Sequence, residues 1–153
     1  MIRLDAIDHQ LLGLLQHDSK QTNKALANKL NLSITAVYER IKKLERNGVI
    51  RNYAALIDPE KVSRAFIAFC QIKLIQHSEQ HIKLFEKEIL RLKEVLSCYH
   101  ISGEYDYIIK IYVENMAAYR EFMVTKLTAI AHIGSTQSSF VINELKNSTA
   151  IEL

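Results

Sequence analysis

The chain has 153 residues, of which 48% are hydrophobic and 24% are charged, a balance that excludes general disorder and is typical of folded globular proteins. This length fits one ordinary domain or two small ones. No apolar run approaches the roughly 18 residues that a membrane span requires, and the start MIRLDAIDHQ is too acidic for a signal peptide. We therefore expect a cytoplasmic protein without a membrane partner, in which Cys70 and Cys98 are buried thiols.

Charge is distributed unevenly along the chain. The formal net charge is +3, but residues 1–57 contain 9 Lys and Arg against 5 Asp and Glu, whereas residues 58–153 contain 11 against 12. A basic N-terminal part on a near-neutral remainder is typical of a nucleic-acid-binding head, although many solvated helical surfaces carry a similar excess.

The N-terminal part predicts three short helices. Apolar residues at helical spacing predict helices over 5–17, 22–30 and 34–46. Between the last two, Asn31 tolerates the left-handed backbone of a tight turn, and Ser33 can cap the helix that follows. Two helices joined in this way form a helix-turn-helix, in which the second helix enters the major groove of DNA.

The outward side of the 34–46 helix carries the groups that DNA recognises. Methyl groups suit thymine, a carboxylate suits the amino group of cytosine, and cations suit guanine or phosphate oxygens. The candidate DNA-binding residues are Ser33, Thr35, Ala36, Tyr38, Glu39, Arg40, Lys42, Lys43 and Arg46. A solvated helix face would show similar residues, and three-helix units also bind proteins.

Beyond Gly48 the pattern changes to strand formers. Residues 49–58 predict a connecting strand that stops at Asp58-Pro59. Then follow predicted strands over 65–75, 95–102, 105–113 and 133–145, with helices over 78–92 and 116–130. The order β-α-β-β-α-β predicts a ferredoxin-like domain with helices on one sheet face. Apolar residues on both alternations of 108–113 indicate that a second subunit covers the other face.

The motifs resemble those of the Lrp/AsnC, or feast/famine, transcriptional regulators. LDAIDHQLLGLLQHDSKQTNKALANKLNLSITAVYERIKKLERNGVIRNYAALIDPE is similar to the family's N-terminal half, which has a leading Leu-Asp, an Ala-x-x-Leu-x-Leu-Ser turn and an Arg-Ile/Val-x-x-Leu-Glu helix. SGEYDYIIKIYV, followed by AAYREFMVTKL, is similar to its effector domain. The resemblance covers nearly the whole chain.

The resemblance implies an α+β fold with three parts. These are a helix-turn-helix (winged-helix-like) DNA-binding domain over 1–50, a connecting strand and hinge over 51–64, and a ferredoxin-like effector-binding and oligomerisation domain over 65–153. It also implies a sequence-specific transcriptional regulator of the nucleoid that binds double-stranded DNA and responds to an amino-acid effector. The protein is expected to form homodimers that assemble into tetramers or octamers.

In such proteins the effector lies near the turn between the second and third strands of the second domain, at an interface between dimers. Carried over by motif, the effector-binding residues are Ser102, Gly103, Glu104, Tyr105 and Asp106, with Thr136, Gln137 and Ser138 from the polar run near the last strand. Asp106 is expected to bind the ammonium group, and hydroxyl and amide groups the carboxylate. By themselves these residues also suit an ordinary hairpin turn. His132 replaces a glycine that is usual in the family.

Other kinds of site are not expected. His77 and His81 have the spacing of helical metal ligands, but no third ligand accompanies them, so we predict no metal site and no cofactor. With only 4 glycines the chain has no nucleotide-binding loop, and it has no common hydrolase motif, so we predict no enzyme. The alternative to a regulator is an architectural protein that bends DNA without an effector.

Overall fold

The computed structural model describes residues 3–153; residues 1 and 2 of the predicted first domain lie outside the described residues. The chain divides into two compact units. The helical unit contains the residues up to Leu56 together with Leu145–Leu153, and the sheet unit contains Ile57–Glu144. Over residues 3–153, no helix has the length and apolar character needed to cross a membrane.

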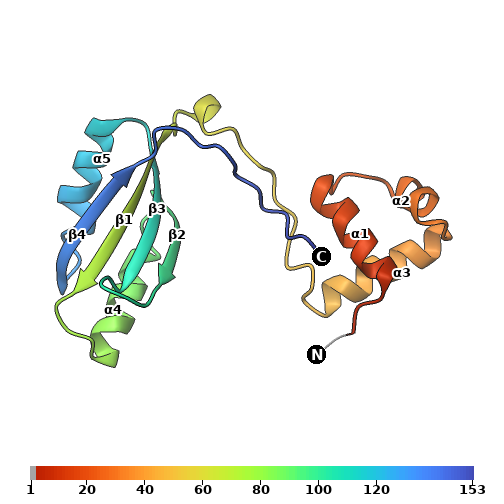
Figure 1. Cartoon of the computed structure of the whole chain (residues 1–153), viewed down its shortest axis with the longest axis horizontal. Coiled ribbons are helices and arrows are strands. Elements are labelled where there is room, and N and C mark those ends of the chain that lie inside the picture. The colour runs from red at the N-terminus through yellow and green to blue at the C-terminus, as the bar shows by residue number, and fades with distance from the viewer. Residues whose placement is uncertain (1–2) are drawn as a thin grey trace. The chain divides into compact units, whose positions relative to one another are not determined.

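Three helices form the helical unit, as predicted: α1 (Ala6–His17), α2 (Asn23–Leu30) and α3 (Ile34–Arg46) (Figure 1). Each buries one side and exposes the other. The apolar core that results contains Leu11, Leu12, Leu15, Leu26, Ala27, Val37 and Leu44. This core fixes which side of α3 faces outward.

Caps and one turn residue set the helix boundaries. The hydroxyl of Ser33 accepts a hydrogen bond from the Ala36 backbone N–H at 3.1 Å and begins α3. Asn31 has φ 52°, the left-handed conformation predicted for the tight turn between α2 and α3. The sequence therefore determines the helix-turn-helix through local interactions.

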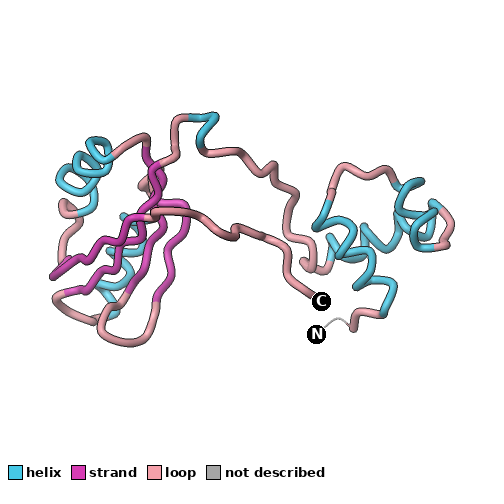
Figure 2. Tube along the Cα trace, turned by 45° about the horizontal axis from the view of Figure 1, so that its top comes forward, coloured by secondary structure: helices cyan, strands magenta, loops and turns pink. Residues whose placement is uncertain are grey.

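The predicted strand over 49–58 is wrong. The backbone N–H groups of Val49 and Ile50 both donate to the Leu44 carbonyl, at 3.0 and 3.2 Å, and so close the end of α3. The following residues to Asp58 pair with no strand in the described part of the chain, and Figure 2 shows them as loop. Strand formers alone do not make a strand, because the backbone also needs a hydrogen-bonding neighbour.

The sheet unit has the predicted β-α-β-β-α-β order. Its elements are η1 (Glu60–Val62), β1 (Phe66–Leu74), α4 (Glu79–Ile89), β2 (Val95–His100), β3 (Tyr107–Val113), α5 (Met116–Phe122), the π-helical turn η2 (Met123–Leu127) and β4 (Ile133–Phe140). The antiparallel sheet has the order β2-β3-β1-β4, which confirms the ferredoxin-like prediction (Figure 1).

Several helices and strands were predicted to be longer than they are. The strand predicted to end at residue 145 ends at Phe140, and the helix predicted over 116–130 gives way to η2 after Phe122. The hinge contains η1, where the Asp58 carboxylate accepts from the Glu60 backbone N–H at 3.0 Å. Boundaries depend on such local bonds, which periodicity does not register.

Helices α4 and α5 cover one face of the sheet. Their side chains join alternate strand residues in a core that includes Ala68, Cys70, Ile72, Phe85, Ile89, Ile109, Ile111, Tyr119 and Phe122. The alternate strand positions point to the opposite face of the sheet. There, Phe69, Ile108 and Tyr112 are half-buried. Lys110 lies among them, with its Nζ 5.7 Å from the Phe69 ring centroid and 5.1 Å from that of Tyr112. An aromatic and aliphatic sheet face thus lies opposite the helices.

Candidate nucleic-acid interface and ligand site

The outward side of α3 is built by burial of its other side. Val37 and Leu44 are fully buried, whereas Thr35, Glu39 and the 46% exposed Tyr38 face away from the core. Near the start of the helix, these residues and the half-buried Ala36 offer a hydroxyl, a carboxylate, a phenol and a methyl group. This combination suits the edges of base pairs.

Three cations lie toward the end of α3, and they differ in what they already bind. Lys42 forms an ion pair of 2.8 Å with Glu45, which also accepts a hydrogen bond from the Tyr53 hydroxyl at 3.0 Å. Burial and this bond raise the pKa of Tyr53 to about 12. Within residues 3–153, Lys43 and Arg46 form no ion pair, and both are exposed. Their charges are available to phosphate.

Arg40, a predicted DNA-binding residue, is already paired within the helical unit. Its guanidinium reaches back to α1 and donates to Asp5 at 2.8 Å and to Asp8 at 2.6 Å. The Asp8 side chain is only 2% exposed, so an unpaired charge there would be unfavourable. The Asp8 N–H and then Arg40 hold the pKa of Asp5 below its ordinary value of 3.8. Arg40 therefore joins α3 to α1.

The turn between β2 and β3 holds the first group of predicted effector residues. Ser102, Gly103 and Glu104 are exposed, and Gly103 has φ 128°, a conformation that side chains disfavour. The Tyr105 hydroxyl donates to the Gln137 side-chain oxygen of β4 at 2.7 Å. The structure thus brings together two predicted effector residues that are distant in sequence.

Asp106 is occupied within the sheet unit. One carboxylate oxygen accepts from the Leu74 backbone N–H at 2.7 Å, and the other lies 2.7 Å from Nε2 of His77. Burial alone would raise the pKa of the Asp106 carboxyl, but these two partners outweigh burial and hold the pKa below 3.8. An ammonium group at Asp106 would therefore share the carboxylate with Leu74 and His77.

The residues predicted from β4 divide between the two sheet faces. Ser138 lies on the helix-covered side, where its hydroxyl is 2.5 Å from that of Tyr119. Gln137 therefore lies on the opposite side, and Thr136 is half-buried. The polar run is part of β4, so alternation separates residues that are consecutive in sequence.

Sequence reasoning missed the contacts made by two histidines. His77 precedes α4 and pairs with Asp106, so it is not the first residue of a helical metal motif. His132 has φ 70°, a region that favours glycine, and its ring lies against that of His81, with 3.9 Å between centroids and the planes tilted by 32°. The replacement of the usual glycine was the available signal. No group of three or more candidate metal ligands occurs among residues 3–153.

Two family models match this arrangement. The model described as "Lrp/AsnC ligand binding domain" matches residues 67–151, more than half of the chain. A second, described as "Winged helix-turn-helix DNA-binding", matches residues 4–51. The two matches coincide with the ferredoxin-like fold and with the three helices.

Curated relatives match along almost the whole chain. The chain is 35% identical over 150 residues to the DNA-binding transcriptional activator DecR of Escherichia coli (strain K12). The match covers 98% of this chain and 99% of DecR. It is also 35% identical over 150 residues to the leucine-responsive regulatory protein of Haemophilus influenzae, which covers 98% of this chain and 90% of that protein. These relatives are transcriptional regulators.

Solved structures agree with both findings. A transcriptional regulator from Neisseria meningitidis, solved as a complex with L-Met, has a TM-score of 0.93 at 32% identity over 97% of this chain and 96% of its own. An AsnC family transcriptional regulator from Agrobacterium tumefaciens has a TM-score of 0.93 at 34% identity over the same shares of the two chains. With both domains matched in order along its length, this chain belongs to the Lrp/AsnC family of DNA-binding transcriptional regulators.

Proposed function

We propose that the protein is a sequence-specific transcriptional regulator that inserts α3 into the major groove of DNA. The observation that carries this proposal is the exposed side of α3. It has varied hydrogen-bonding groups at its start and, at its end, Lys43 and Arg46, which form no ion pair within residues 3–153. Ser33, Thr35, Ala36, Tyr38 and Glu39 contact base edges or nearby phosphates, and Lys42, Lys43 and Arg46 contact the backbone. Arg40 supports this helix from behind through Asp8.

A second copy of the chain covers the open sheet face in this proposal. The half-buried Phe69, Ile108 and Tyr112 form an apolar surface, and the Lys110 charge within it pairs with Glu144 at 3.1 Å. A two-fold dimer then presents two α3 helices to half-sites about one helical turn, or a multiple of it, apart. Dimers join further into tetramers or octamers, which sedimentation measurements can distinguish.

The effector of the proposed regulator is an amino acid. The N. meningitidis relative was solved as a complex with L-Met, which supports an amino-acid ligand for the similar domain here. We place the ligand beside Ser102, Gly103, Glu104, Tyr105, Thr136 and Gln137. Because these residues are exposed or half-buried, another dimer has to cover the ligand. Asp106 holds the turn in place, and Ser138 holds β4 against α5.

Two experiments test these proposals. A thermal-shift screen of the proteinogenic amino acids identifies an effector, because a ligand that binds only the folded state raises the apparent melting temperature. Selection of bound fragments from random DNA, followed by competition with unselected DNA, tests sequence specificity. Equal affinity for selected and unselected DNA, without any amino-acid response, would favour the architectural alternative. We also propose that the protein acts in the cytoplasm, where it binds the DNA, and that it has no catalytic role.

A further inference from the structure

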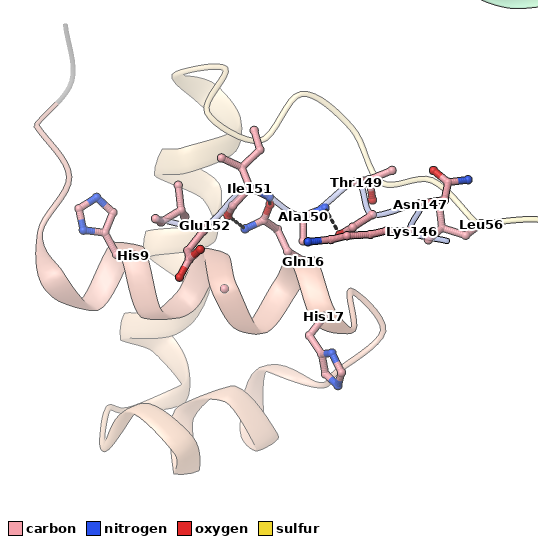
Figure 3. Close-up of a pocket in the computed structure, with 13 residues that line it drawn as sticks. His9, Gln16, His17, Leu56, Lys146, Asn147, Thr149, Ala150, Ile151 and Glu152 are labelled. Atoms are coloured by element: carbon pink, nitrogen blue, oxygen red, sulfur yellow. Dashed lines mark hydrogen bonds between the residues drawn. The ribbon is translucent and has the colours of Figure 1, made fainter. Parts of the chain in front are cut away.

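The C-terminal tail is part of the helical unit, although the family's ligand-binding domain runs to residue 151 by sequence. The tail, Leu145–Leu153, follows the outward side of α1 that carries His9, Gly13, Gln16 and His17. A cavity of about 560 Å³ lies between this side of α1 and the tail, and Figure 3 shows Gln16 pointing at the tail backbone. The described end of the chain therefore docks on the helix that supports α3.

Two hydrogen bonds between one side chain and one residue hold the tail. The Gln16 side-chain amide donates to the Ile151 carbonyl at 3.0 Å, and the Ile151 N–H donates to the Gln16 side-chain oxygen at 2.7 Å (Figure 3). Gln16 thus pairs with the extended backbone as a neighbouring strand would. The contact sets the register of the tail without recognising an Ile151 side chain. We call this pair of bonds the Gln16 clamp.

The clamp is built to be reversible. Ile151 is 71% exposed and Leu153 is 60% exposed, so the docked tail removes little apolar surface from water. Hydrogen bonds at an exposed position contribute little net free energy, because water replaces either partner. Release of the tail would therefore cost little apolar burial.

Docking of the tail changes how the two units are connected. The chain passes from the helical unit to the sheet unit between Leu56 and Ile57, and it returns between Glu144 and Leu145. While the clamp is closed, the second connection also restrains the helical unit. A body restrained at two points of the chain has fewer accessible orientations than a body restrained at one.

We propose that the Gln16 clamp is a releasable second tether, which restricts the orientations of the helical unit and so narrows the half-site spacings that a dimer accepts on DNA. The inference rests on the proposed DNA binding by paired α3 helices. With the clamp closed, each α3 is held closer to one orientation, and operators with altered spacing bind poorly. With the clamp open, the helical units adjust their orientation to the DNA, and the preference for one half-site spacing weakens.

The test uses the full-length protein and a matched pair of substitutions on α1. Gln16→Met removes both hydrogen bonds while it keeps side-chain length and helix propensity. Gln10→Met makes the same change at an exposed α1 position that does not line the cavity between α1 and the tail. Hydrogen exchange of the C-terminal peptide reports tail docking, and affinity for selected operators with spacings changed by about one to three base pairs reports orientation.

We expect the Ile151 amide to exchange about tenfold faster in Gln16→Met than in the wild type and in Gln10→Met. Gln16→Met should also lose about threefold or more of the wild-type discrimination between optimal and altered spacings, with unchanged affinity for the optimal operator. Free exchange of Ile151 in the wild type, or full discrimination by Gln16→Met, would overturn the tether. A wild type that binds no DNA refutes the proposed function instead, and the exchange result still decides whether the clamp exists.

Discussion

The two units arrange their candidate functional residues in different ways. In the helical unit, the proposed DNA-binding residues follow one another along α3 and its cap, so helical period alone places them on one side. In the sheet unit, Tyr105 and Gln137 are 32 residues apart and meet because β3 and β4 both flank β1. A surface on one helix can be predicted from sequence, whereas a site shared by strands needs the sheet order.

Charged residues give the same contrast on a smaller scale. Arg40 lies next to the proposed DNA surface but pairs with the buried Asp8, and Asp106 lies next to the proposed ligand site but binds Leu74 and His77. Helical period placed Arg40 with its neighbours on α3, and the family motif placed Asp106 with its neighbours in the turn. Burial distinguishes them, because a desolvated charge requires a partner inside the protein.

The largest expected effect tests the proposed DNA surface. Replacing Lys43 and Arg46 together by Ala should weaken operator binding about 100-fold at about 100 mM salt, because counterion release at the phosphates is lost. The slope of log affinity against log salt should fall by about one for each lost contact. Titration by fluorescence anisotropy at several salt concentrations measures both. Lys93→Ala, an exposed cation of the sheet unit, serves as the control, and equal effects from both variants would remove α3 from the groove.

The next prediction, with a smaller expected effect, compares a buried ion pair with an exposed one. Arg40→Leu leaves Asp8 buried without its cation and should destabilise the helical unit by about 2 kcal/mol. Arg91→Leu breaks the exposed 3.0 Å pair with Glu88 and should change stability by less than about 0.5 kcal/mol. Hydrogen exchange of α1 and α3 peptides in the full-length protein measures the first change. Full stability of Arg40→Leu combined with weak DNA binding would return Arg40 to the DNA surface.

The proposed ligand site predicts a loss of amino-acid response. Gln137→Ala should weaken binding of the amino acid that gives the largest thermal shift by about tenfold, because it removes a hydrogen-bonding group on the open side of β4. L-Met is the first amino acid to test. Calorimetric titration gives the affinities, with Ser139→Ala, an exposed neighbour on the same strand, as the control. Unchanged affinity in Gln137→Ala would place the ligand elsewhere.

The smallest expected effect is a pH dependence of the sheet unit. The pKa of Asp106 is lower in the folded protein than the ordinary 3.8, so folding favours the ionised carboxylate. Its contribution to stability is complete above that ordinary value and is lost as the pH falls through the lowered pKa. Urea unfolding between about pH 6 and pH 3 should therefore show a shallower acid loss for Asp106→Asn than for the wild type. Glu104→Gln, in the exposed turn, should follow the wild type, and parallel curves for all three proteins would contradict the assignment.

Much of the fold could be predicted because the responsible interactions are local. Ser33 and Asn31 mark the helix-turn-helix, and the change from helical to strand period after Gly48 separates its helices from the β-α-β-β-α-β part. The failed strand over 49–58 shows the limit of this reasoning. Its residues favour a strand, but pairing depends on a neighbour that local sequence does not specify.

The amino-acid sequence by itself determined the helices, their caps, the order of the strands along the chain and the family, because each depends on residue spacing over short distances. Only the tertiary structure decided that Arg40 turns inward, that Tyr105 meets Gln137, and that the tail returns to Gln16 on α1. Those contacts join residues 32 or more positions apart. Their formation depends on which surfaces the folded core brings together, and periodicity carries no information about that.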